Sequence, residues 1–333
     1  MSDLRTMNLV GGRGYTGSEL LRLLAGHPKM ELGIASSSSV AGQSISSACD
    51  GWPDDGRTFT QLEPGAISAY PADAWVLALP NDLAGAWVEA ILKEFPGSVI
   101  LDLSADYRFD PNWTYGLPER FREQIGSAKL IANPGCYPTA ITLALLPAVE
   151  KGLINIGDII ADAKSGVSGA GRKAALATQF SEVSESFKAY SASGHRHLPE
   201  ITQTLNNVQV ESEVNLTFVP HLVPMNRGIF ATIYVKPIDH AEGLQECYAA
   251  YYAQEEFVDV MPQGSHPDTA SVRATNSCRI ALHPGSDKSQ PTVILSVIDN
   301  LVKGAAGQAI QNMNIMLGLD EAMGLDSPSL IPG

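Results

Sequence analysis

The chain has 333 residues, of which 44% are hydrophobic and 17% charged, and its formal net charge is −14. The composition is that of an ordinary globular protein, and the length predicts two domains, because single cores stop growing at about 250–300 residues. The acidic balance argues against nucleic acid or an anionic membrane surface as a partner. No apolar run approaches the length of a membrane span, so we expect none.

The N-terminal residues lead directly into an apolar run, so we expect no signal peptide. The four cysteines, Cys49, Cys136, Cys247 and Cys278, lie far apart and show no C-x-x-C spacing. A disulfide framework and a structural zinc site are therefore not expected. We predict a cytoplasmic protein with reduced thiols.

Strands and helices alternate along the first part of the chain. Apolar runs predict strands at 7–10, 30–35, 75–79, 99–103 and 130–132, and helical patterns lie at 16–25 and 83–95. This alternation is typical of a parallel sheet covered by helices. Residues 1–135 are therefore expected to form a Rossmann-type α/β domain.

The pattern changes after about residue 155. Predicted strands, several with alternating polarity, lie at 158–163, 214–220, 229–235, 279–282 and 293–298. We expect 136–299 to form an α+β domain with a mostly antiparallel sheet. The segment 300–319 is strongly helical and is expected to return to the first domain, which then comprises 1–135 and 300–333.

A glycine-rich motif lies between the first predicted strand and helix. Residues 12–17 read Gly-Arg-Gly-Tyr-Thr-Gly and fit G-x-G-x-x-G in the context that binds a dinucleotide. Glycines let the backbone approach a pyrophosphate, and the helix N-terminus faces the anion. The predicted cofactor-binding residues are Gly12, Arg13, Gly14, Tyr15, Thr16 and Gly17. A plain glycine turn is the alternative.

The second predicted strand ends in serines. An NAD site usually places an acidic residue there, on the ribose hydroxyls. Glu31 lies at the start of this strand, which is the wrong end. Ser36 and Ser37, together with Arg13, suit a 2′-phosphate better, so NADP(H) is the favoured cofactor. A merely polar loop is the alternative.

A cysteine lies at the start of an apolar helix. Residues 133–139 read Asn-Pro-Gly-Cys-Tyr-Pro-Thr and precede a predicted helix over 140–149. Unpaired backbone N–H groups and the positive end of the helix dipole favour a thiolate there. Cys136 is therefore a candidate nucleophile, and a buried structural cysteine is the alternative.

Two histidines lie in one short segment. Residues 195–200 read His-Arg-His-Leu-Pro-Glu, and Pro199 is expected to begin a helix, with both histidines on the preceding loop. A histidine there could deprotonate a thiol and then act as an acid. A zinc site is less favoured because no third ligand has suitable spacing. Ordinary surface histidines are the alternative.

Two further loops carry polar groups after predicted strands. Residues 164–172, with three glycines, two serines and a final arginine, could cradle an anion. In residues 102–109, Arg108 could clamp a phosphate or carboxylate. A flexible turn is the alternative for the first loop, and a salt bridge of Arg108 with Asp106 or Asp110 for the second.

Together these motifs resemble the N-acetyl-gamma-glutamyl-phosphate reductase family of the semialdehyde dehydrogenases. The matching segments, in the family's order, are 11–17, 101–109, 115–119, 133–139, 164–172, 194–201, 218–228 and 299–308. The segments around Cys136 and His195 are the most specific. One departure is Leu79-Pro80-Asn81, because many members have histidine after the proline.

The resemblance implies NADPH-dependent reduction of an acyl phosphate to an aldehyde, in arginine biosynthesis, with release of inorganic phosphate. It implies Cys136 as nucleophile and His195 as acid–base, with His197 as the alternative and Glu200 orienting an imidazole. The candidate substrate-binding residues are Arg108, Asn133, Ser165, Arg172 and Arg196. The sequence does not decide which of the three arginines binds the phosphate and which the carboxylate. Further candidate cofactor contacts are Ser168, Gly169 and Asn300. The small residues of 304–307 are expected to let the nicotinamide ring approach.

Several other functions compete. A sister reductase could act on aspartyl phosphate or on a carrier-linked aminoadipyl phosphate, although this acidic chain shows no basic cluster for docking a carrier. A non-catalytic NADP-sensing protein would not need Cys136 at a helix start, and a cysteine hydrolase would not need the glycine motif. By fold analogy we expect a homodimer or homotetramer.

Overall fold

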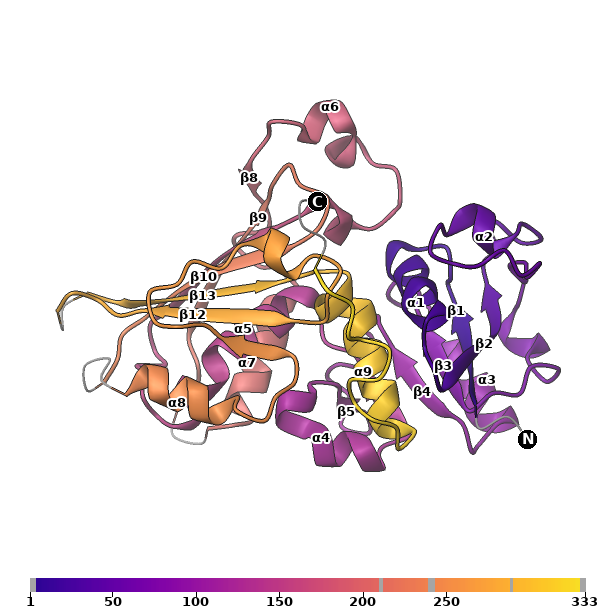
Figure 1. The fold of residues 1–333 in the computed structure, drawn as a ribbon, viewed down its shortest axis with the longest axis horizontal. Coiled ribbons are helices and arrows are strands. Elements are labelled where there is room, and N and C mark those ends of the chain that lie inside the picture. Colours follow the sequence, from indigo (N-terminus) through magenta and orange to yellow (C-terminus); the bar gives the residue numbers. More distant parts are fainter. Residues whose placement is uncertain (1–3, 210–211, 239–242, 288–289, 330–333) are drawn as a thin grey trace. The chain divides into compact units, whose positions relative to one another are not determined.

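The computed structural model describes residues 4–209, 212–238, 243–287 and 290–329. The chain divides into two compact units, Met1–Pro134 with Ala305–Ser327, and Gly135–Gly304 with Pro328–Gly333 (Figure 1). Compared with the predicted domains, the first division falls one residue earlier and the second after Gly304, which leaves Asn300 in the second unit. Pro328 and Ser329, predicted in the first domain, fall in the second unit, and residues 1–3 and 330–333 lie outside the described residues.

The first unit is built from alternating strands and helices. Its elements are β1 (Arg5–Val10), α1 (Tyr15–Ala25), β2 (Met30–Ser36), α2 (Ile45–Ala48), β3 (Ala74–Leu77), α3 (Gly85–Glu94), β4 (Val99–Asp102), β5 (Thr114–Tyr115), α4 (Pro118–Ser127), β6 (Leu130–Ala132) and α9 (Gly307–Met316). The sheet has the order β2-β1-β3-β4-β6-β5, and every pairing is parallel. The predicted Rossmann-type parallel sheet is confirmed.

The predicted elements of this unit differ from the observed ones at their ends, and α2, β5 and α4 were not predicted. The helix expected over 83–95 begins at Gly85, and α4 was not predicted, although Pro118 at its first position is a typical helix-start signal. The long helix expected over 300–319 is a π-turn at Val302–Ala306 followed by α9. Helix α9 packs against α4 and α1, as expected for a segment that returns to the first domain.

The second unit combines one central helix with a large mixed sheet. Its elements are α5 (Cys136–Glu150), β7 (Ile159–Ser165), α6 (Phe180–Val183), β8 (Lys188–Ala189), α7 (His197–Asn206), β9 (Leu216–Leu222), β10 (Ile229–Val235), α8 (Leu244–Tyr251), β11 (Val258–Val260), β12 (Cys278–His283) and β13 (Thr292–Ile298). The sheet order is β11-β12-β13-β10-β7-β9-β8. Four of its six pairings are antiparallel, which confirms the mostly antiparallel α+β domain.

Helix α5 forms the core of the second unit. It is apolar on all sides and buried from Tyr137 to Val149, as expected of a helix enclosed by other elements. It packs on β10, β13 and β12 and also contacts α7 and α8. Its N-terminal residue is Cys136, four residues before the predicted start, so the candidate nucleophile is itself helical.

A proline inside α5 explains one of its tertiary contacts. Pro147 has no N–H group, so the carbonyl of Leu143 lacks its usual intrahelical donor. The hydroxyl of Tyr252, just after α8, donates to this carbonyl at 2.6 Å, and Tyr248 donates to Ala144 O at 2.6 Å. Helix α8, which was not predicted, therefore holds the body of α5 and leaves its N-terminus to other elements.

Candidate active site

The glycine motif forms a tight turn between β1 and α1. Gly11 has a φ of +89°, and a Cβ atom there would lie 2.3 Å from Ala78 O. A Cβ on Gly17 would lie 2.5 Å from Gly11 O, and one on Gly12 would lie 2.9 Å from the Phe59 ring. Gly14 is the residue before α1 and would meet only one atom, at 3.6 Å. The glycines that the backbone requires are therefore Gly11, Gly12 and Gly17.

The turn is anchored on the predicted serine end of β2. The carbonyl of Ser36 accepts hydrogen bonds from the N–H groups of Gly11, at 3.1 Å, and Gly12, at 2.9 Å. Ser37 is buried, and its hydroxyl lies 3.3 Å from that of Ser39. Tyr15 begins α1, whose first turn carries no acidic residue and no side-chain cap. This helix N-terminus can therefore receive an anion.

The carboxyl end of β4 carries a buried acid. Asp102 is fully buried, and its carboxylate accepts a hydrogen bond from the Ser104 hydroxyl at 2.5 Å. Burial raises the pKa of the Asp102 carboxyl from 3.8 to about 6, and the bonds from Ser104 oppose this shift. The sequence contains this residue in a matching segment, but only the fold shows that the carboxyl is buried.

Two predicted substrate ligands make structural contacts within the first unit. Arg108 donates to the carbonyls of Asn133, at 3.0 Å, and Leu103, at 3.1 Å. The side chain of Asn133 is fully buried, where its amide donates to Ala305 O and its oxygen accepts from Asn312. These bonds give both residues a structural role, while their contact with a substrate stays a prediction.

The N-terminus of α5 is held by a carboxylate from α7. Glu200 is buried and accepts a hydrogen bond from the N–H of Gly135, the residue before Cys136, at 2.9 Å. The carbonyl of Gly135 in turn accepts from the N–H and the hydroxyl of Thr139, at 2.9 and 3.0 Å. The backbone that carries Cys136 is thus fixed on both sides. The predicted role of Glu200 in orienting an imidazole stays a prediction.

Cys136 packs closely against Gly304. A Cβ atom on Gly304 would lie 2.7 Å from the Cβ of Cys136. Gly304 belongs to the π-turn, and its N–H donates to Asp299 O at 3.0 Å. Small residues at 304–307 were predicted to let the nicotinamide ring approach, but at Gly304 the structure shows another reason for glycine, since a side chain there would displace the cysteine.

His195 lies in a cluster of rings around Tyr137. The ring centroids of Tyr137, Tyr190 and Phe218 lie 5.6, 5.6 and 5.4 Å from that of His195, and the His197 ring lies at 4.8 Å. The Tyr190 hydroxyl donates to that of Tyr137 at 3.2 Å, and Tyr137 donates to His221 O at 3.2 Å. Burial raises the pKa of both tyrosines, and the charge of Cys136 adds to the rise. His195 and Cys136 therefore surround the same tyrosine pair.

The protonation of His195 follows from its surroundings. Burial first, and the charge of Arg196 second, lower the pKa of His195 from 6.5 to about 4, so the imidazole is neutral at pH 7. The N–H of His197 donates to Nδ1 of His195 at 3.1 Å. A neutral ring that accepts at Nδ1 carries its proton on Nε2 and can donate a hydrogen bond there. His197 was expected on the loop, but it is the first residue of α7.

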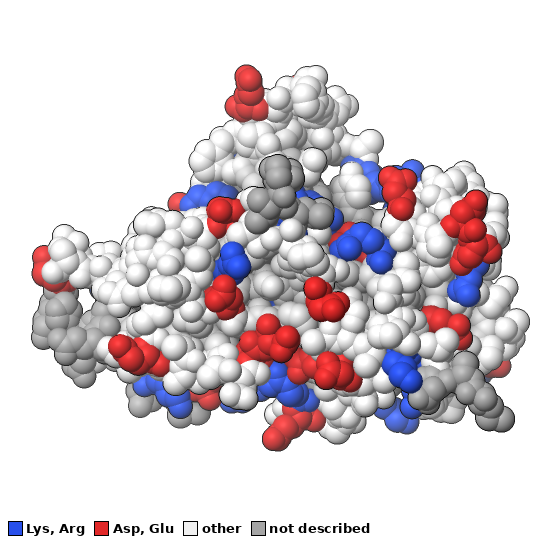
Figure 2. Space-filling model, viewed as in Figure 1, with Lys and Arg blue, Asp and Glu red and all other residues white. Residues whose placement is uncertain are grey.

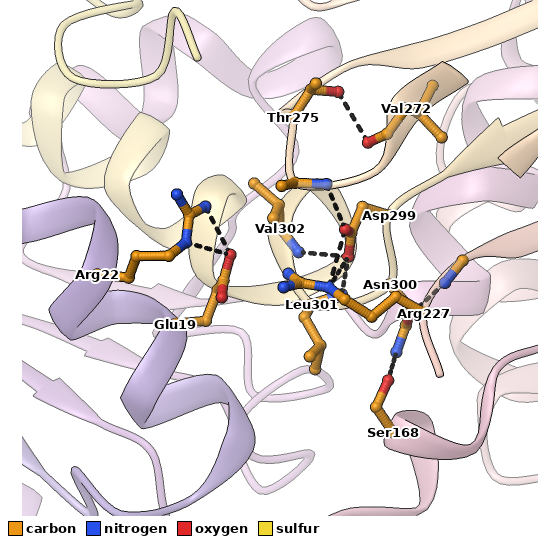
Figure 3. Close-up of polar contacts among 12 residues, drawn as sticks. Glu19, Arg22, Ser168, Arg227, Val272, Thr275, Asp299, Asn300, Leu301 and Val302 are labelled. Atoms are coloured by element: carbon orange, nitrogen blue, oxygen red, sulfur yellow. Dashed lines mark hydrogen bonds and ion pairs between the residues drawn. The ribbon is translucent and has the colours of Figure 1, made fainter. Parts of the chain in front are cut away.

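A network centred on Asp299 fixes the end of β13 (Figure 3). Its buried carboxylate accepts from Arg227 and from the N–H groups of Ala274 and Leu301. The neighbouring Asn300, predicted to bind the cofactor, accepts from Gly228 N–H at 2.7 Å and donates to the Ser168 hydroxyl at 3.0 Å. Asn300 therefore ties the candidate anion loop to the sheet.

The anion loop begins where β7 ends. Ser165 is buried and donates to Gly166 O at 3.0 Å, and a Cβ on Gly169 would lie 2.9 Å from the Ser165 hydroxyl oxygen. Arg172 and Arg196 are both exposed, and Arg196 directly precedes α7. The structure thus brings Ser165, Ser168, Gly169 and Asn300 together in the second unit. Their contacts with substrate or cofactor stay predictions.

Family models match both units. The semialdehyde dehydrogenase NAD binding domain matches residues 6–128, and the semialdehyde dehydrogenase dimerisation domain matches residues 136–300. N-acetyl-gamma-glutamyl-phosphate reductase from Pseudomonas fluorescens SBW25 is 48% identical over 98% of this chain and 99% of its own length. The enzyme of the same name from Nitrosococcus oceani is 49% identical over 97% of this chain and 98% of its own length. The chain belongs to the N-acetyl-gamma-glutamyl-phosphate reductase family of the semialdehyde dehydrogenases.

Solved structures agree on the semialdehyde dehydrogenase fold. Aspartate semialdehyde dehydrogenase II from Vibrio cholerae, complexed with ASA, has a TM-score of 0.75 and 16% identity over 95% of this chain and 99% of its own. Aspartate semialdehyde dehydrogenase with NADP from Candida albicans has a TM-score of 0.71 and 16% identity over 94% of this chain and 99% of its own. At this identity the likeness concerns the fold. Within the described residues, no helix is long and apolar enough to cross a membrane.

Sequence reasoning missed three residues of this family member's candidate site. Gly11 was part of a matching segment, but the motif was counted from Gly12. Tyr137 lies in the segment around Cys136, and a buried tyrosine beside a nucleophile could have been considered. Tyr190 lies in a segment rich in serine and alanine that gave no signal, because only the fold brings it to Tyr137.

Proposed function

We propose that this chain reduces N-acetyl-gamma-glutamyl phosphate to N-acetylglutamate semialdehyde with NADPH, in arginine biosynthesis, through a thioester on Cys136. The relatives that match this chain over nearly their whole length are named for this activity. The observation that carries the catalytic part is Cys136 at the N-terminus of α5, beside the ring cluster of His195.

The turn of the first unit fits the dinucleotide. Its glycines leave space that a Cβ atom would fill, and α1 begins there with no acidic residue in its first turn and no side-chain cap. Residues 11–17 would hold the pyrophosphate, and Ser36, Ser37 and Arg13 are proposed to favour NADP(H). When bound, the cofactor supplies the hydride that turns the acyl group into an aldehyde.

Cys136 performs the acyl transfer. Its thiolate attacks the acyl-phosphate carbon, so an S–C bond forms while the bond to the phosphate oxygen breaks and inorganic phosphate leaves. Cys136 is the first residue of α5, and the positive end of this helix is proposed to stabilise the developing oxyanion. After reduction the Cys136 sulfur leaves as thiolate, and the aldehyde is released.

His195 is proposed as a hydrogen-bond donor to the substrate oxygen. Its neutral ring carries a proton on Nε2, since Nδ1 accepts from the His197 N–H. A hydrogen bond from Nε2–H to the substrate oxygen stabilises the tetrahedral oxyanion formed when the acyl group is reduced. This oxyanion re-forms the C=O bond as the C–S bond breaks, so the neutral ring keeps its proton. The sequence also allowed His195 to deprotonate the thiol first, but with Nδ1 occupied that step would need the other tautomer.

We also propose that the chain acts as a cytoplasmic homo-oligomer. Its four cysteines are free thiols, as in proteins of reducing compartments. On β7 and β10, Ile160 and Tyr234 pair across the strands and stay 41% and 36% exposed. An exposed apolar sheet surface in a domain of the dimerisation family supports pairing of two copies.

The reverse reaction tests the proposal. Purified protein is mixed with N-acetylglutamate semialdehyde, NADP and phosphate, and NADPH absorbance is followed. We expect phosphate-dependent activity that Cys136→Ala lowers by about 10⁴-fold or more. Cys247→Ala is the matched control, because Cys247 is also a half-buried free cysteine, and it should keep the activity.

Other outcomes have defined meanings. Activity that survived in Cys136→Ala would overturn the thioester. A protein that binds NADP but turns over only aspartate semialdehyde would be a sister enzyme. Hydrolysis of an acyl substrate without NADP would favour the cysteine hydrolase.

A further inference from the structure

The segment 171–194, here called the arm, carries unusually exposed apolar side chains. Among the described large hydrophobic residues, Phe180 is 84% exposed, Leu176 70% and Phe187 61%. The arm contains α6, which lies away from the sheet of its own unit, and β8, which forms the edge of that sheet (Figure 1). A protein seldom exposes a cluster of this kind without a partner for it.

The charge of the arm distinguishes it from the rest of the chain. It holds three basic residues (Arg172, Lys173, Lys188) and two acidic ones (Glu182, Glu185), a net charge of about +1, whereas the whole chain carries −14. In Figure 2 the lobe at the top of the view is largely uncharged. Two copies of an acidic chain repel each other least where the contact surface is nearly neutral and apolar.

Two backbone positions in the arm are also strained. Glu185 and Ser191 have φ values of 59° and 47°, in the left-handed region that favours glycine. Such conformations persist where surrounding contacts impose them. Most of the arm is exposed in the single chain, so these contacts are expected from a partner.

The ends of the arm lead into the candidate site. Before it, Ser168 is bonded to Asn300, and near its end Tyr190 donates to Tyr137 and lies beside His195. Strand β8 pairs with β9 through Lys188 and Ala189, which ties the returning segment to the sheet. A contact that orders the arm therefore orders both the anion loop and the ring cluster.

We propose that the arm docks onto a second copy of this chain, and that this contact holds the segments of Ser168 and Tyr190 in their active arrangement. The inference rests on the proposed homo-oligomer. The second copy is the occupant because the arm lies within residues 136–300, which match a dimerisation domain, and because its apolar, nearly neutral surface suits a copy of the same acidic chain. Assembly and catalysis are then coupled through the two ends of one segment.

The test compares Phe180→Asp and Leu176→Asp with wild type and with Leu92→Asp. Leu92 is an exposed leucine on α3, outside the dimerisation domain, and makes a matched control. Sedimentation over a range of concentrations gives the dissociation constant of the assembly, and the reverse reaction is measured at the same concentrations. Thermal unfolding shows whether each variant is folded.

We expect Phe180→Asp to raise the dissociation constant by about 100-fold or more, as for a central interface residue. Specific activity should fall as the variant dissociates and recover as its concentration rises, while Leu92→Asp should match wild type. A folded Phe180→Asp and Leu176→Asp that assemble as tightly as wild type would overturn the docking.

Two further results separate the inference from the proposed function. Dissociated Phe180→Asp that kept full activity would overturn the coupling. Wild-type protein that is monomeric while catalysing the NADP-dependent reaction would overturn the docking to a second copy and leave the proposed chemistry intact. Absence of that reaction in an assembled wild type would contradict the proposed function alone.

Discussion

The first helix of each unit begins in the same way and serves a different chemistry. Both α1 and α5 follow a glycine, Gly14 or Gly135, and both lack a side-chain cap and an acid in the first turn. In α1 the surrounding glycines leave the backbone bare, which suits a bound anion. In α5 the first residue is Cys136, and a carboxylate from another helix holds the preceding N–H. A helix N-terminus thus becomes a binding site or a nucleophile site according to what lies beside it.

After Cys136→Ala, the largest effect on the rate should come from His195, a residue with no counterpart in the site at α1. His195→Gln should lower kcat by about 10²–10³-fold, as for the loss of one hydrogen-bond donor to a developing oxyanion. Dinucleotide affinity should be unchanged, which fluorescence titration checks. A similar loss of affinity and rate would mean that His195 serves the fold of the cluster.

The pH dependence of His195 sharpens the same point. Burial lowers its pKa to about 4, so the folded protein keeps the imidazole neutral where the unfolded chain, with a pKa of 6.5, takes up a proton. Stability from this group is lost as pH falls from about 6.5 through 4. An NMR titration should show a His195 pKa near 4, raised in Arg196→Gln. A value near 6.5 would contradict the burial.

A matched pair of glycine substitutions separates the two sites. Gly304→Ala pushes on Cys136 and should lower kcat by about 100-fold with unchanged NADP affinity, since a displacement of about 1 Å can cost that much. Gly17→Ala collides with Gly11 O and should weaken NADP binding by about 10-fold or more, as steric strain of 1–3 kcal/mol implies.

The control for this pair is Gly26→Ala, because a Cβ on Gly26 meets no atom within 4 Å. It should leave both rate and affinity unchanged. Loss of NADP affinity in Gly304→Ala would instead favour the sequence-based role of 304–307, in which small residues admit the nicotinamide ring.

Local signals made much of this predictable. The strand-glycine-helix pattern of 12–17 and the cysteine before an apolar helix are properties of a few neighbouring residues, and the fold class followed from periodicity. The contact of Glu200 with Gly135 spans 65 positions, and that of Tyr190 with Tyr137 spans 53. Such pairs depend on how α7 packs on α5 and how β8 pairs with β9, which no local pattern encodes. Arg108 and Asn133 were assigned by chemistry alone, although their side chains bond to the backbone of their own unit.

In the first unit, Asp102 makes stability depend on pH in the opposite direction to His195, and the effect is smaller. Burial raises the pKa of Asp102 to about 6 from 3.8, so its contribution to stability is complete below 3.8 and is lost as pH rises through 6. Asp102→Asn removes this loss, so its unfolding free energy relative to wild type should rise by about 2 kcal/mol between pH 4 and 7. Denaturant unfolding at both pH values checks this.

Exposed Glu94→Gln, on α3 of the same unit, is the control for Asp102→Asn and should show no such trend. A flat difference between Asp102→Asn and wild type would mean that the Asp102 carboxyl titrates as an exposed one.

The smallest effect concerns the carboxylate that distinguishes α5 from α1. Glu200→Ala leaves the buried N–H of Gly135 without its acceptor and should cost about 1–3 kcal/mol of unfolding free energy. Glu200→Gln keeps an acceptor oxygen and should cost less than about 1 kcal/mol. Exposed Glu123→Ala, on α4, is the control. If Glu200 mainly orients an imidazole, Glu200→Gln will shift the pH profile of kcat while stability is preserved. If it mainly holds the helix start, Glu200→Gln will keep that profile, and only Glu200→Ala will lose rate and stability together.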